Sequence, residues 1–160
     1  MKINEIITED EGNVITLWHG GHGLESNYHE LQKSSKGRWE HGPGLYLTNS
    51  YARAQKYAGG RRKVYKVTIR PGTDISKVSL DYSSIEHFAR TTIIGKLRNQ
   101  FLQDIKHHME RINSEHIPAR VFLNLLINYD AVASAKTPEI TRFLIDHGID
   151  YAIEIGRAHV

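Results

Sequence analysis

The first half of the chain carries short hydrophobic runs that are rich in β-branched and aromatic residues. These runs predict strands at residues 14–18, 45–48 and 64–69, each next to glycine or proline. The first strand is expected to end just before His19, which precedes a pair of glycines. The polar, glycine-punctuated stretch 20–42 that follows is expected to form a long surface loop.

A short helix is predicted between the second and third strands. Asn49 or Ser50 is expected to cap it, because a side-chain oxygen at that position accepts a hydrogen bond from an exposed backbone N–H. The helix is expected to run to about Ala58 and to stop at Gly59 and Gly60.

The second half of the chain has the three-and-four spacing of helices that face a core. Ser83 and Glu86 have the spacing of a capping box, which predicts a helix start. Pro118 and the dipeptide Thr137-Pro138 are expected to begin two further helices. One apolar stripe is expected to face the core and to carry no chemistry: Ile94, Leu97, Phe101, Ile105, Met109 and Ile112.

Together these elements predict an α+β fold. A final strand is expected at 149–155, so that strands enclose a helical insertion at about 82–147. No repeat and no break in composition marks a boundary, and we expect residues 1–160 to form a single domain. The 39% hydrophobic and 24% charged residues favour a packed, folded chain.

The composition gives expectations about the chemistry of the protein and its cellular compartment. The chain has no cysteine, which excludes disulfides, thiolate zinc sites and cysteine nucleophiles. No apolar run reaches the roughly 20 residues that cross a bilayer, and the first residues lack the apolar region of a secretory signal. We therefore expect a cytoplasmic monomer with no membrane partner. The net charge is +3, and the dense basic run at 61–63 is expected to be a solvated turn before a strand.

Three features near the predicted strands indicate a ligand pocket. His19 lies beside Gly20 and Gly21, where a backbone without side chains can approach a ligand closely. Tyr46 alternates with leucines along its strand and is expected to face away from the core, and Tyr57 follows on the short helix. Two facing tyrosines form a slot for a flat heteroaromatic ring, and each stacked pair contributes about 0.5–1.5 kcal/mol.

These residues resemble the ADP-ribosyltransferase superfamily, in the His-Tyr-Glu branch that includes poly-ADP-ribose polymerases and diphtheria-like toxins. Residues 17–20 (Leu-Trp-His-Gly) are similar to the first motif of that branch and 44–48 (Gly-Leu-Tyr-Leu-Thr) to its second. Residues 54–58 (Ala-Gln-Lys-Tyr-Ala) resemble the helix that follows, and the resemblance covers about 15–69. It implies a split β-sheet core, NAD as co-substrate, and transfer of ADP-ribose to a protein or nucleic-acid acceptor.

The resemblance also implies roles for individual residues. His19 would bond a ribose hydroxyl of NAD, Gly20 would hold the nicotinamide amide through its backbone, and Tyr46 and Tyr57 would sandwich the nicotinamide ring. The catalytic set would be His19, Tyr46 and a glutamate, because negative charge stabilises an oxocarbenium-like transition state. Glu154, in the predicted final strand, is the candidate for that glutamate.

Two features depart from the family pattern. Ala54 stands where the family often has a small hydroxyl residue. Residues 154–160 resemble the in-frame translation of a sequencing adaptor, and we expect this tail to be non-native. The catalytic glutamate is then either Glu154 or a residue beyond a truncated C-terminus.

Other functions fit parts of the same pattern. An RNA 2′-phosphotransferase has the same fold and consumes NAD, and it would need phosphate ligands such as Arg38 and His41. A catalytically degenerate domain would bind NAD or a nucleotide without turnover. Histidines such as His19 and His22 lack the fixed helical spacing of a zinc motif, so we expect no metal.

Overall fold

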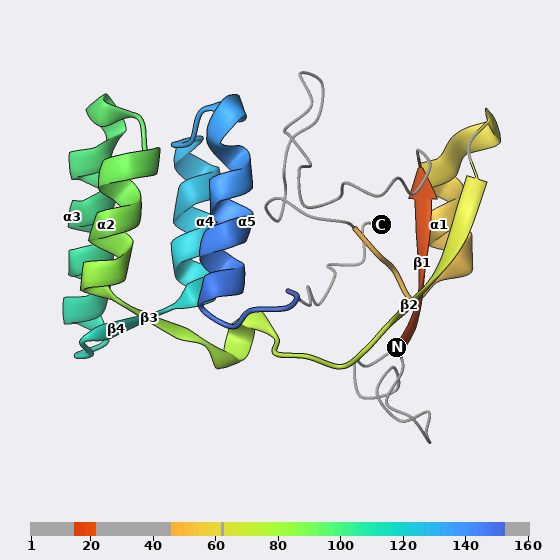
Figure 1. Ribbon diagram of the computed structural model, residues 1–160, viewed down its shortest axis with the longest axis horizontal. Helices are drawn as coiled ribbons and strands as arrows, with labels where there is room; N and C mark the ends of the chain where they lie inside the picture. Colours follow the sequence, from red (N-terminus) through yellow and green to blue (C-terminus); the bar gives the residue numbers. More distant parts are fainter. Residues whose placement is uncertain (1–14, 22–45, 62, 153–160) are drawn as a thin grey trace. The chain divides into compact units, whose positions relative to one another are not determined.

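The computed structural model describes residues 15–21, 46–61 and 63–152, which fall into two compact units. Residues 15–21, 46–61 and 63–72 belong to the first unit, and 73–152 to the second. Figure 1 shows that the first unit combines strands with one helix, whereas the second is mainly helical. The protein is therefore a mixed helix and strand structure, as expected of the α+β class.

Two antiparallel strands, β1 (Ile15–Gly21) and β2 (Lys63–Ile69), form the sheet of the first unit. Their register runs from Ile15 opposite Ile69 to Gly21 opposite Lys63. β1 is longer than the predicted strand, because its register with β2 continues through both glycines at its end. His19 therefore lies inside the strand, and the prediction that it follows the strand is wrong.

The other edge of β1 carries a much shorter pairing. Trp18 N–H donates to the Thr48 carbonyl at 2.7 Å, and Thr48 N–H donates to the Trp18 carbonyl at 2.9 Å. This is an isolated antiparallel bridge, and Tyr46 and Leu47 before it belong to no strand. The strand predicted at 45–48 is therefore reduced, over its described residues, to one bridging position.

Helix α1 (Tyr51–Ala58) confirms the predicted short helix. Arg53 N–H donates to the Ser50 side chain at 3.2 Å, so Ser50 is the N-cap. The helix ends at Gly59, whose φ of 62° is a left-handed value that favours glycine. A 3₁₀ turn (Gly59–Arg61) then leads toward β2, as expected for a turn before a strand.

The four helices of residues 73–152 lie side by side, with a small antiparallel strand pair at one end of them (Figure 1). Short 3₁₀ turns at Ile75–Lys77 and Ser134–Lys136 join these elements. The strands and helices are β3 (Ser79–Asp81), α2 (Tyr82–Thr92), α3 (Gly95–Arg111), β4 (His116–Pro118), α4 (Ala119–Tyr129) and α5 (Thr137–Asp146). None of the described helices combines the length and the hydrophobicity that crossing a membrane requires.

The core of the second unit is built from the apolar faces of these helices. Phe101 and Ile105, at the centre of the predicted stripe on α3, are fully buried. Ile94 and Ile112 are 37% and 42% exposed, because they flank the two ends of α3. The stripe is therefore confirmed in its middle and wrong at its ends. Aromatic rings link the helices through Phe88, Phe101, Phe122 and Phe143.

Two of the predicted helix starts are confirmed, and the predicted capping box of the third is wrong. α4 begins directly after Pro118, and α5 begins at the predicted dipeptide. α2 is capped by Asp81 rather than by Ser83, so the predicted capping box is wrong: Glu86 pairs with Arg90 instead. The strand predicted from 149 is reduced, up to residue 152, to a single bridge between Tyr151 and Asp74.

Asp81 supplies a test of this local structure. The backbone N–H of Ser84 donates to its carboxylate at 3.0 Å and the Ser84 hydroxyl at 2.7 Å, and these bonds hold the pKa of Asp81 below its usual value. Asp81→Ala is expected to lower the free energy of unfolding by about 1 kcal/mol at pH 7, measured by urea denaturation. Because the folded-state pKa is lowered, the difference from wild type should shrink as the pH falls below about 4.

The matched control for this variant is Ser83→Ala, which removes the hydroxyl of the predicted but wrong capping box. It is expected to change the free energy of unfolding by less than about 0.5 kcal/mol. An equal loss in the two variants would contradict the assignment of Asp81 as the cap.

Candidate functional site

The two edges of β1 pair with different segments: one edge pairs with β2, and the other forms a bridge to Thr48. Trp18 directs its N–H and C=O to Thr48. Successive residues of a strand direct these groups to alternate edges, so Gly20 directs its own N–H and C=O to the Thr48 edge, whereas His19 directs them to β2. The backbone of Gly20 thus faces the side of β1 from which the segment 46–48 approaches.

The ring of His19 lies at the same edge. Its Nδ1 is 2.9 Å from the carbonyl oxygen of Tyr46. A carbonyl only accepts hydrogen bonds, so Nδ1 is the donor in this contact, and in the tautomer with its proton on Nδ1 the other ring nitrogen, Nε2, is an acceptor. The ring is half-buried and lies 6.5 Å from that of Tyr65, its cross-strand neighbour. These contacts hold His19 in a defined orientation and tautomer.

α1 lies directly against the backbone of β1 at Gly20. A Cβ added at Gly20 would stand 1.8 Å from the carbonyl oxygen of Ala54 and 3.0 Å from the backbone nitrogen of Ala58. Both alanines are buried, and the helix has no larger side chain at these positions to hold it away from the strand. The sequence suggested close approach of a ligand at this glycine, and the structure shows close approach of a helix.

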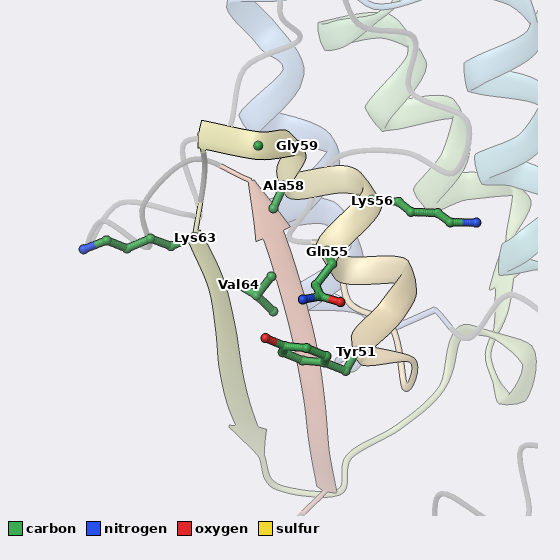
Figure 2. Close-up of a pocket in the computed structure, with 8 residues that line it drawn as sticks. Tyr51, Gln55, Lys56, Ala58, Gly59, Lys63 and Val64 are labelled. Carbon is green, nitrogen blue, oxygen red and sulfur yellow. The ribbon is translucent and has the colours of Figure 1, made fainter.

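Tyr57 lies on α1, and Tyr46 lies in the segment that approaches β1 at Thr48. Tyr57 is two residues beyond Gln55, which faces β2 (Figure 2), and successive helix residues are rotated by about 100°. Tyr57 is therefore on the opposite flank, toward the edge of β1 that receives Tyr46. The exposed fractions are 45% for Tyr46 and 67% for Tyr57, so both rings are accessible.

Other predicted site residues lie outside the described residues. These are Glu154 with the rest of the tail, and the alternative ligands His22, Arg38 and His41. The described part of the first unit contains no aspartate or glutamate. Within the described residues, no group of three His, Asp or Glu side chains is arranged to hold a metal ion.

A hollow that the sequence did not lead us to predict lies on the β2 side of α1. It has a volume of about 630 Å³ and is shown in Figure 2. Tyr51 and Gln55 are four residues apart and therefore share one helix face. This spacing is the feature of the sequence from which the hollow could have been predicted. Tyr51 also packs edge-on against Trp18, with ring centres 5.0 Å apart.

Comparison with protein families, with curated proteins and with solved structures gives no significant match to this chain. The interpretation of the site therefore depends on the geometry described above.

Gly20 gives the most direct test of this geometry. Gly20→Ala is expected to lower the free energy of unfolding by about 1–3 kcal/mol or more, because its methyl group would meet the helix backbone rather than a flexible side chain. Thermal melts followed by tryptophan fluorescence and circular dichroism measure the loss.

The control is Gly60→Ala in the same unit, where an added Cβ meets nothing within 4 Å. Gly60→Ala is expected to leave the melt within about 0.5 kcal/mol of wild type. Full stability of Gly20→Ala would show that α1 does not rest on β1 at this point.

Proposed function

We propose that the Thr48 edge of β1 binds the nicotinamide end of NAD, and that the protein is a mono-ADP-ribosyltransferase. The observation that carries the proposal is the direction of the Gly20 backbone, which follows from the Trp18–Thr48 bridge. The carboxamide of nicotinamide has an N–H₂ donor and a carbonyl acceptor, and one backbone N–H with its C=O is complementary to this pair.

The tyrosines support a flat ligand beside that backbone. Tyr46 and Tyr57 are both accessible; the carbonyl of Tyr46 bonds His19, and Tyr57 is on the flank of α1 that is turned away from β2. In the proposal their rings enclose the nicotinamide ring, and each stacked pair contributes about 0.5–1.5 kcal/mol of binding free energy.

His19 supports the position of the sugar. Its Nδ1 is engaged by the Tyr46 carbonyl, which leaves Nε2 as an acceptor for one hydroxyl of the ribose. The same bond joins the histidine to the segment that carries one of the stacking rings, so the sugar contact and the ring contact are coupled.

The reaction would be transfer of ADP-ribose. The bond between the ribose C1′ and the nicotinamide nitrogen breaks, and nicotinamide leaves with the electron pair. The positive charge that develops at C1′ is captured by the acceptor nucleophile, which loses its proton. A carboxylate near the ribose would stabilise that charge. We propose Glu154, the candidate that the family resemblance gives, for this role; it lies outside the described residues.

Release of nicotinamide from labelled NAD tests the function. The full chain is expected to release nicotinamide and to label a macromolecular acceptor. His19→Ala and Tyr46→Ala are each expected to reduce the rate by about tenfold or more, since a hydrogen bond and a stacked ring of this kind contribute roughly 1 kcal/mol or more each.

The control for His19→Ala is His107→Ala, which removes an exposed histidine of the second unit. Full activity of His19→Ala would sink the site assignment. Binding of NAD without nicotinamide release by the wild-type chain would instead indicate a catalytically degenerate domain.

Substitution of Tyr57 is expected to affect the binding of NAD more than its turnover. Tyr57→Ala is expected to raise the Kd for NAD by about two- to tenfold, measured by calorimetry, with a smaller effect on the rate at saturating NAD. Tyr57→Phe keeps the ring and should bind NAD nearly as well as wild type. A Phe variant as weak as the Ala variant would contradict a stacking role.

A further inference from the structure

The groove between α1 and β2 is a second accessible feature of the first unit. Tyr51, Gln55 and Val64 point into the space between the helix and the strand, as Figure 2 shows. The groove lies on the opposite flank of α1 from Tyr57, so it is distinct from the proposed nicotinamide edge. Tyr51 is 48% exposed, although one part of its ring packs against Trp18.

The described residues of the two units differ in charge. In the second unit, ten acidic and nine basic residues nearly balance over 73–152. The described part of the first unit has no acidic residue and six basic ones: Arg53, Lys56, Arg61, Lys63, Lys66 and Arg70. An excess of one sign on a compact surface attracts partners of the opposite sign.

Three of these cations surround the groove. Lys56 and Lys63 line it, and their side chains extend outward on either side of it in Figure 2. Lys66 is opposite Trp18 in the register, so it shares the sheet face on which Tyr51 packs. All three lysines are exposed. The cations therefore lie on different sides of the groove, at α1, at the start of β2 and on the sheet face, and this spread suits an extended polyanion better than one small anion.

We propose that this groove binds single-stranded nucleic acid. Phosphates of the strand pair with Lys56, Lys63 and Lys66, and one base stacks on the exposed part of the Tyr51 ring. The Gln55 amide offers a donor and an acceptor to the edge of that base. A duplex keeps its bases stacked on one another, and the acidic side chains of a peptide have no ring to stack on Tyr51, so both fit the groove less well. The proposal does not depend on NAD turnover.

Fluorescence anisotropy of a labelled oligothymidine of twelve nucleotides, titrated with the full protein chain, tests the proposal. Binding is expected in the micromolar range at low salt. With three phosphate contacts, the logarithm of the affinity should fall with the logarithm of salt concentration with a slope of about −2. The double variant Lys56→Ala/Lys63→Ala should weaken binding about tenfold and make the slope shallower by about 1.4.

The matched control is Lys77→Ala/Lys96→Ala, which removes two exposed lysines of the second unit and should change the affinity by less than twofold. Tyr51→Leu should weaken binding about fivefold or more, whereas Tyr51→Phe should retain it. Circular dichroism melts verify that each variant is folded. Absence of binding, equal losses in the two lysine pairs, or equal affinity for a duplex or a polyglutamate peptide would overturn the proposal.

Discussion

The contact of α1 with the main chain of β1 at Gly20 is the constraint on which the first unit depends. A Cβ at this position would lie 1.8 Å from the Ala54 carbonyl oxygen, so the strand and the helix can meet only through a glycine. Ala54 and Ala58 complete the contact because neither has a side chain that would separate the two elements. Interiors are close-packed, and a backbone-to-backbone contact of this kind cannot yield to a rotamer change.

The position of α1 divides the surface of the unit into two flanks. One flank carries Tyr57 and adjoins the edge of β1 where His19 bonds the Tyr46 carbonyl. The other carries Tyr51 and Gln55 and faces β2 across the groove. The nicotinamide proposal and the nucleic-acid proposal therefore share one helix but use different faces of it. A change at Gly20 would disturb both, whereas changes at Tyr57 or Lys63 affect one each.

Local signals predicted more of this structure than non-local ones did. A cap at Asn49 or Ser50, the glycine stop of α1 and the buried centre of α3 follow from neighbouring residues, and all three predictions are confirmed, with Ser50 as the cap. Strand lengths depend on partners elsewhere in the chain. For this reason β1 was predicted too short, and a strand was predicted before Thr48 where the structure has a single bridge. The residue types of the candidate site were visible in the sequence. The helix contact at Gly20 and the gathering of lysines around the groove beside α1 needed the three-dimensional structure.

Amide chemical-shift mapping of the isotopically labelled chain during titration with NAD tests the central claim most directly, because it locates the ligand without any substitution. The account predicts the largest shifts at Gly20, Thr48 and Tyr57, whose amides lie at or beside the proposed nicotinamide edge. Amides of the second unit, such as those of α3, should not move. Shifts concentrated at Gln55 and Val64, or the absence of shifts at saturating NAD, would contradict a nicotinamide site at this edge of β1.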